Sequence, residues 1–216
     1  MTATSTRLLV LGAASIFQPV NGYQLRRELL SWGVADWAHI KPGSIYSVLA
    51  TMARQGFLER HELADGGRPV AVYTVTETGD AERERLFREC LQTVDLQSPL
   101  PFYTAVAVLP LLSREAFAGH LEVRLRSLDR HIEDMTGQGR RSIEAGHTPP
   151  HVGAALELWI RSAEVERQWT AELLDSVRSG AYTFAGEQPV WQPPPDDPGW
   201  QLSNERERYL RLLGRG

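Results

Sequence analysis

A single lysine stands at the predicted start of a helix, where its side chain could bind an anion. Lys41 is the only lysine of the chain, and Pro42, Gly43 and Ser44 follow it. Proline suits the first helical turn, because the amide hydrogen that it lacks would have no partner there. The helix dipole, the expected free N–H groups of Gly43 and Ser44, and the flexible cation all favour a phosphate. The alternative is a solvated surface lysine.

Polar residues continue along one face of this predicted helix, and apolar residues occupy the opposite face at helical spacing. The polar face carries Ser44, Ser47, Thr51 and Arg54. Short hydroxyl side chains let a helix lie deep in the major groove of DNA and can bond bases or phosphates. The pattern therefore predicts DNA contact by this face, although a merely soluble face stays open. Tyr46 lies on an adjacent face, where it could contact a phosphate or pack on the preceding helix.

The elements around this helix follow from hydrophobic periodicity and turn residues. Residues 8–17 form a predicted buried first helix, and residues 23–32 form a second one that ends at Gly33. Residues 57–63 and 70–75 are predicted to be two strands joined by a glycine-containing turn. Three short helices followed by a hairpin form a winged helix-turn-helix. The third helix then reads the DNA, and the hairpin is the wing.

This arrangement assigns roles to residues outside the third helix. Tyr23 and Gln24 begin the second helix, which crosses the phosphate backbone in this motif. For Tyr23, packing in the core is an equal alternative. Arg68 lies at the tip of the wing, where contact with the minor groove or the backbone is expected; the alternative is an ordinary turn arginine. The predicted DNA-binding residues are Tyr23, Gln24, Lys41, Ser44, Tyr46, Ser47, Thr51 and Arg68.

The second half of the chain is predicted to be helical and to pair two copies. From Leu121 to Met135 the apolar residues have the spacing of a coiled-coil seam, and residues 137–139 are expected to fray or interrupt that helix. Residues 152–177 predict a helix that is apolar on two sides and therefore buried between two layers. Its Trp159 and Trp169 could line a cavity for an aromatic effector, although core or dimer packing is the commoner role. The pattern predicts a homodimer.

Composition limits the remaining possibilities. The chain has 216 residues, 42% of them hydrophobic, and a net charge of -4, which suits a globular protein of one large domain or two small ones. Residues 1–76 are slightly basic and the remainder is acidic. No apolar run approaches a membrane span. The lone Cys90 excludes a disulfide scaffold and fits a reducing cytosol, so we expect a cytoplasmic protein.

The expected fold is mainly α with a minor α+β part. We predict a winged helix-turn-helix domain at residues 1–80, a helical dimerisation and effector domain at 81–184, and a proline-rich tail with a short terminal helix at 185–216. His147 and His151 are separated by prolines and have no third ligand nearby, so no metal is expected. Neither a cofactor motif nor a coherent acid–base pair is present, and an enzyme is not expected.

Short motifs in the first eighty residues resemble those of the PadR family of bacterial transcriptional regulators. They are Leu8–Gly12, Asn21–Leu25, Lys41–Tyr46, Gln55–Leu58, Gly67–Pro69, Tyr73 and Thr76–Gly79. The second half resembles the longer class of this family, whose helical region pairs two chains. The resemblance implies a dimeric repressor of double-stranded DNA, often released by a small aromatic or hydrophobic effector. The alternative function is a winged-helix adaptor that binds proteins and has lost DNA binding.

Overall fold

The computed structural model describes residues 3–197 and 200–214. The chain divides into two compact units. The first unit comprises residues 1–90, 100–111 and 191–216, and the second comprises residues 91–99 and 112–190. The mainly helical fold predicted from the sequence is confirmed.

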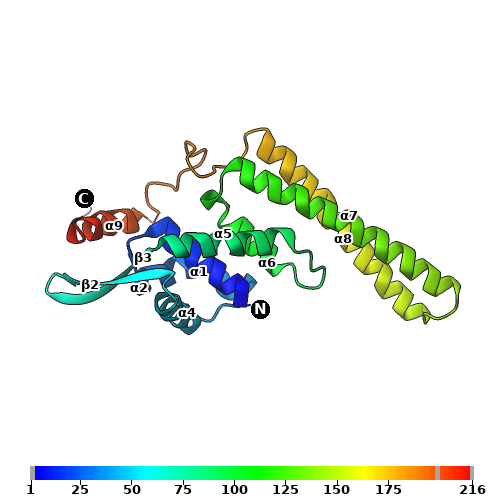
Figure 1. Cartoon of the computed structure of the whole chain (residues 1–216). Helices are drawn as coiled ribbons and strands as arrows, with labels where there is room; N and C mark the ends of the chain where they lie inside the picture. Colours follow the sequence, from blue (N-terminus) through cyan, green and yellow to red (C-terminus); the bar gives the residue numbers. More distant parts are fainter. Residues whose placement is uncertain (1–2, 198–199, 215–216) are drawn as a thin grey trace. The chain divides into compact units, whose positions relative to one another are not determined.

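The first unit has the element order of a winged helix (Figure 1). Its elements in chain order are α1 (Ala3–Phe17), β1 (Val20–Asn21), α2 (Gly22–Ser31), α3 (Val34–Trp37), α4 (Pro42–Arg54), β2 (Leu58–Asp65), β3 (Arg68–Val75), α5 (Glu77–Gln92), α6 (Leu100–Ala107), the 3-10 turn η1 (Leu109–Leu111) and α9 (Trp200–Leu212). The strands form an antiparallel sheet in the order β1-β3-β2. The sequence did not predict β1 or α3. The third helix predicted from the sequence, the reading helix, is therefore α4 in the structure.

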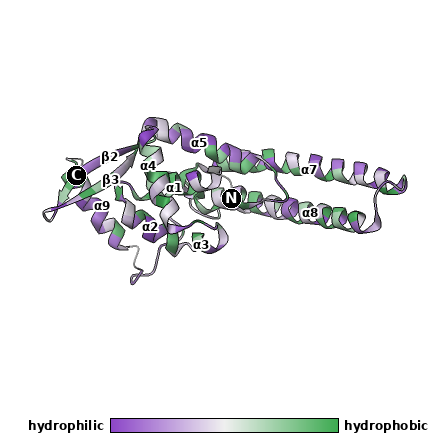
Figure 2. Cartoon of the chain, turned by 90° about the horizontal axis from the view of Figure 1, so that it is seen from below, coloured by the Kyte–Doolittle hydropathy of each residue, from purple (hydrophilic) through white to green (hydrophobic). Residues whose placement is uncertain are grey.

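Helix α1 is the core of the first unit. Residues Leu8 to Leu11, together with Ala13 and Ala14, are completely buried, and Figure 2 shows the hydrophobic character of this helix. A helix that is apolar on all sides must be surrounded by other elements. Accordingly, α1 contacts α2, α4, β3, α6, η1 and α9. The predicted buried first helix is confirmed.

A two-residue turn closes the wing. Asp65 pairs with Arg68 across the hairpin, and Gly66 and Gly67 between them have φ angles of 57° and 79°. Tight hairpin turns of this type need positive φ at both central residues, which glycine adopts without steric cost. The glycine pair therefore fixes the register of the strands and the place of Arg68 beside the tip.

The starts of α2 and α4 follow known capping chemistry. Asn21 caps α2: its side chain accepts from the backbone N–H of Gln24, while the Gln24 side chain accepts from the backbone N–H of Asn21. This reciprocal pair is a capping box. Lys41 is the N-cap residue of α4, and Pro42 lies in its first turn as predicted.

The second unit is built on two long antiparallel helices, α7 (Arg114–Glu144) and α8 (Pro150–Arg178), with hydrophobic residues recurring along both (Figures 1 and 2). The prediction that residues 137–139 interrupt α7 is wrong, because the helix is continuous through them. Gly139 is buried, and a Cβ atom there would overlap the side chain of Leu156 on α8. The glycine lets the two helices approach closely. No helix in the described ranges is long and apolar enough to cross a membrane.

A buried arginine joins three segments of the second unit. The Arg124 side chain is 1% exposed. Its guanidinium donates to the backbone oxygens of Leu91 and Thr93 at 3.1 and 2.8 Å, and its Nε donates to Glu166 of α8 at 2.8 Å. A buried charge is tolerated only when it is paired and its donors have partners. Arg124 meets that condition by tying residues 91–93 to both α7 and α8.

The units do not coincide with the domains expected from the sequence. Residues 81–90 of α5 and the whole of α6 were assigned to the helical domain, yet residues 81–90 and 100–111 belong to the first unit. The tail was expected to form a part of its own. Instead, α9 contacts α1, and its Leu202 and Tyr209 are only 5% and 2% exposed. Pro198, in the predicted tail, lies outside the described residues.

Gly79 provides a test of the packing at the base of the wing. It lies in the first turn of α5, where a Cβ atom would overlap the backbone oxygen of Phe57. A backbone atom cannot move aside as a side chain can, so Gly79→Ala should lower the free energy of unfolding by about 1–3 kcal/mol. Thermal unfolding followed by circular dichroism measures this change.

The matched control is Gly119→Ala in α7, where nothing lies within 4 Å of the added carbon. This variant should keep or slightly raise stability, because alanine is the better helix former. A Gly79→Ala protein as stable as the wild type would contradict the packing argument.

Candidate nucleic-acid interface

Helix α4 has one buried face and one open face. Ile45, Leu49 and Met52 are buried against the core, while Lys41, Ser47 and Arg54 are exposed. Ser44 and Thr51 are half-buried. The apolar residues of α4 predicted to face the core are the buried ones, and the polar face is available to a partner.

Part of this polar face borders a shallow hollow between α1 and α4. The hollow has a volume of about 350 Å³, and its lining residues are Thr6, Arg7, Ser44, Ser47, Val48, Thr51 and Met52. It brings Arg7 of α1 beside the α4 hydroxyls, a neighbour that the sequence pattern does not indicate. The Arg7 guanidinium donates to Gln55 at 3.1 Å and to Glu82 at 2.9 Å. Hydrogen bonds from Arg85 and then from Arg7 hold the pKa of Glu82 below its ordinary value, so this carboxylate stays charged beside Arg7.

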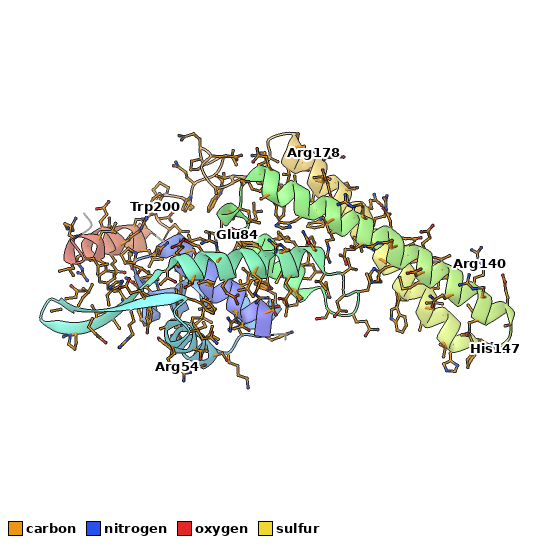
Figure 3. All side chains as sticks on the ribbon, viewed as in Figure 1. Arg54, Glu84, Arg140, His147, Arg178 and Trp200 are labelled. Carbon is orange, nitrogen blue, oxygen red and sulfur yellow. The ribbon has the colours of Figure 1, made fainter. Side chains whose placement is uncertain are left out.

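The polar groups of α4 differ in how free they are. The backbone N–H of Ser44 donates to the oxygen of Lys41 at 2.9 Å, so the prediction that it is free to bind phosphate is wrong. The Ser47 hydroxyl donates to the Ser44 oxygen at 3.0 Å, which leaves its lone pairs as acceptors. Arg54, at the end of α4 (Figure 3), donates to the Thr51 hydroxyl at 3.1 Å. Within the described ranges, Lys41 makes no side-chain hydrogen bond or ion pair.

Two tyrosines lie near the start of α2. Tyr23 is 62% exposed and Tyr46 is 44% exposed, so core packing does not describe Tyr23. Tyr46 lies over the start of α2, where a Cβ atom on Gly22 would be only 3.0 Å from its Cε1. Gly22 therefore makes room for the Tyr46 ring.

Gln24 has a different place from the one predicted. Its side chain was expected to contact DNA, but the residue is 3% exposed. Its amide group serves the cap of α2 and donates to Glu205 of α9. Both ends of the amide are thus used inside the protein, and Gln24 is removed from the predicted DNA-binding set.

Arg68 lies at the wing tip as predicted. It is exposed and begins β3, directly after the glycine turn. The residue opposite, Asp65, forms an ion pair with Arg208 of α9. Across the part of the chain that the structure describes, the Arg68 guanidinium has no such partner and is available at the tip.

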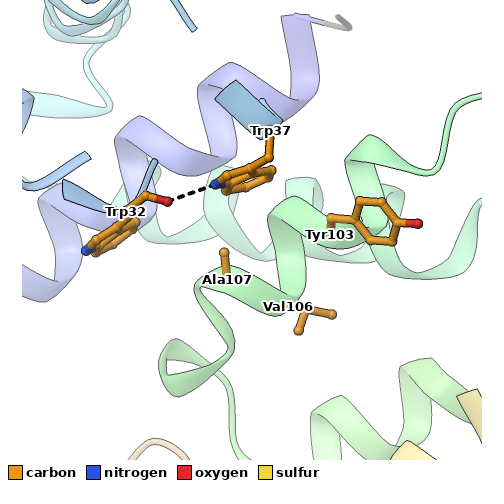
Figure 4. Close-up of a pocket in the computed structure, with 5 residues that line it drawn as sticks. All are labelled: Trp32, Trp37, Tyr103, Val106 and Ala107. Atoms are coloured by element: carbon orange, nitrogen blue, oxygen red, sulfur yellow. Dashed lines mark hydrogen bonds between the residues drawn. The ribbon is translucent and has the colours of Figure 1, made fainter. Parts of the chain in front are cut away.

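The two tryptophans predicted to line an effector cavity are on the surface of α8. Trp159 and Trp169 are 45% and 44% exposed in the single chain. An aromatic cavity lies instead in the first unit, with a volume of about 570 Å³ (Figure 4). Trp32, Trp37, Tyr103, Val106 and Ala107 line it. The Trp37 indole N–H donates to the Trp32 backbone oxygen at 2.9 Å, which fixes one wall.

Cys90 and the metal-binding residue types are the remaining reactive groups of the described ranges. Cys90 is completely buried, and burial raises the pKa of its thiol to about 12. A protonated thiol is a poor nucleophile, in agreement with the interpretation of Cys90 as a core residue. No three His, Cys, Asp or Glu side chains among residues 3–197 and 200–214 are grouped so that they could hold a metal ion.

Part of the first unit is similar to a known protein family. Residues 10–85 match the model of the family described as "Transcriptional regulator PadR-like family". Among solved structures, PadR of Bacillus subtilis in complex with operator DNA is 17% identical to the chain, covering 79% of this chain and 98% of that one, with a TM-score of 0.30. None of the curated proteins compared with the chain matches it. The match includes α2, α4 and the wing, so residues 10–85 form a PadR-like domain.

Proposed function

We propose that this protein is a dimeric, sequence-specific DNA-binding repressor. The observation that carries the proposal is the open polar face of α4, flanked by the exposed Arg68 of the wing within a PadR-like domain. A recognition helix with short side chains fits the major groove closely. A wing arginine fits the minor groove or the phosphate backbone. Occupation of an operator by such a protein would block transcription.

Each residue of the proposed interface has a role in this proposal. Ser44, Ser47 and Thr51 contact base edges or phosphates from α4, and Lys41 contacts a phosphate at its N-terminus. Tyr23 and Tyr46 lie near the start of α2, where their hydroxyls can bond the phosphate backbone. The chain carries a net charge of -4, so affinity depends on where these few groups are placed.

Dimerisation is proposed through α8. One face of this helix packs on α7, and another carries exposed apolar side chains, among them Leu158 (64%) and Val165 (69%). Trp169 extends the same stripe at helical spacing. Large apolar residues gathered on one helix face are typical of an interface with a second chain. Two reading heads would then bind half-sites about 34–36 Å apart.

Release by an effector is the last part of the proposal. The aromatic cavity in the first unit has the volume of a small-molecule site and is lined by three aromatic residues. Such walls suit a flat aromatic compound. We place the effector there in preference to the exposed rings of Trp159 and Trp169, which fit the dimer interface. A tenfold preference for the DNA-incompetent form, about 1.4 kcal/mol, would suffice to shift binding tenfold.

A mobility-shift experiment tests the function as a whole. The full chain should shift the DNA upstream of its own gene at lower concentration than a scrambled duplex of equal length. Raising the salt concentration should weaken both complexes. Equal binding to both duplexes would contradict sequence specificity, and binding to neither would leave the winged-helix adaptor as the better function.

Lys41→Ala should flatten the dependence of DNA affinity on salt. A dimer loses two phosphate contacts, so the slope of log K against log salt concentration should fall by about 1.8, or 0.9 for each contact. Fluorescence anisotropy of a labelled operator measures the slope. Arg140→Ala removes the same charge from the exposed surface of α7 in the second unit and serves as the control. An unchanged slope for Lys41→Ala would make Lys41 an ordinary surface residue.

Val165→Glu should convert the dimer into a monomer. A carboxylate in the centre of an apolar interface has no partner, and its desolvation opposes association. Light scattering at micromolar protein concentration gives the mass. Gln168→Glu adds the same group to a neighbouring polar position of α8 and should stay dimeric. A monomeric wild type, or a dimeric Val165→Glu, would contradict the α8 interface.

Tryptophan fluorescence distinguishes the two effector locations. Phenolic and polycyclic compounds that loosen the operator complex should still quench the Trp159→Phe and Trp169→Phe proteins. Quenching should fall in Trp37→Phe, because Trp37 is a wall of the cavity. Ala107→Phe, which fills the cavity, should abolish the effect on DNA binding. Loss of quenching only in the α8 variants would return the effector to Trp159 and Trp169.

A further inference from the structure

Helix α9 is seated on two parts of the DNA-binding domain that lie far from it in the sequence. At α2, the Tyr209 hydroxyl accepts from Asn21 at 2.9 Å, and Glu205 accepts from Gln24. At the wing tip, Arg208 forms an ion pair with Asp65. Between them, Arg206 donates to the backbone oxygen of Gln18 at 2.8 Å, and Leu202 and Tyr209 are buried.

The contacted residues are those that place the proposed DNA contacts. Asn21 and Gln24 form the capping box of α2, next to the exposed Tyr23. Asp65 is the last residue of β2 and pairs with Arg68 across the turn. The Asp65 side chain is only 20% exposed, although it stands at the end of a hairpin. A hairpin tip held on one side loses freedom before it meets a ligand, which lowers the entropy cost of binding.

The position of α9 leaves the reading helix open. In Figure 1, α9 and α4 lie on opposite sides of the β2–β3 hairpin. The exposed face of α4 therefore stays uncovered while the wing is held from behind. This placement argues against an autoinhibitory helix, because such a helix would cover the surface that DNA needs.

We propose that α9 is a brace that holds the wing tip and the start of α2 in the arrangement that binds DNA, with Arg208 and Tyr209 as its positioning residues. The inference rests on the proposed DNA binding. It concerns residues that touch no DNA themselves and act through Asp65 and Asn21. Loss of the brace frees the wing and weakens binding, while the fold and the dimer remain.

Two single substitutions with opposite charge effects test the brace. Arg208→Ala removes a positive charge and Asp65→Asn removes a negative one, so attraction to DNA alone predicts weaker binding for the first and tighter binding for the second. The brace predicts weaker binding for both, by about fivefold, the upper range for a partly exposed ion pair. Tyr209→Phe, which deletes only the hydroxyl bonded to Asn21, should weaken binding in the same direction.

Arg211→Ala is the matched control, because it removes the same charge from an exposed position of α9. It should bind operator DNA within twofold of the wild type, and Arg208→Lys should restore most of the affinity lost in Arg208→Ala. Tighter DNA binding by Arg208→Ala would overturn the brace in favour of an inhibitory helix. Unchanged binding by both Arg208→Ala and Asp65→Asn would make the contact structural only.

Hydrogen exchange of the free protein gives a readout that does not require DNA. Amides at the wing tip, residues 63–70, should exchange faster in Arg208→Ala than in the wild type, with Arg211→Ala unchanged. Equal exchange in all three proteins would contradict the brace directly. If the wild type bound no DNA, the proposed function would fail, while the exchange comparison would still decide whether α9 holds the wing.

Discussion

The burial of residues 8–14 in α1 is the constraint on which the first unit depends. A helix that is apolar around its whole circumference cannot form one side of a two-layer domain, because every face needs a covering element. The helices of the reading motif, the third strand, α6 and the C-terminal helix all supply that cover. The relative positions of α2, α4 and the wing therefore follow from packing around one hydrophobic rod. The polar residues proposed to meet DNA are carried on the outward faces of that packing.

The second unit combines an apolar centre with one buried polar interaction. Arg124 is buried in α7, and its partners come from residues 91–93 and from α8. Removing one partner would leave a buried charge without compensation, a change that typically costs 3–5 kcal/mol. The pair thus specifies how α7, α8 and residues 91–93 fit together. The exposed apolar stripe of α8 is left for contact outside the chain.

Local chemistry made most of the first unit predictable, and contacts distant in sequence made the rest unpredictable. Pro42, the period of α4 and the Gly66–Gly67 turn each depend on near neighbours, so the reading helix and the wing could be located from the sequence. Gln24 is of a residue type that often contacts DNA, and it lies at the start of α2. Its side chain is nevertheless used within the protein, because it bonds with Asn21, three residues away, and with Glu205, 181 positions away. Helix α9 is mostly polar, and only its docked partners reveal that it belongs to the first unit. Gly139 was predicted to interrupt its helix because glycine is a poor helix former. Its actual role, to make room for Leu156, could not be predicted because Leu156 lies on another helix.

The chain uses arginine for every side-chain cation except one, and that one stands at the N-cap of α4. Lys41 is therefore the only lysine side chain in this sequence that amine-modifying reagents and enzymes can modify, and it lies at the helix proposed to read DNA. Acylation there would remove a charge from that helix and leave the arginine ion pairs untouched. The reactivity of one amine consequently reports whether the reading surface is covered, so the protein carries a footprinting probe of its own.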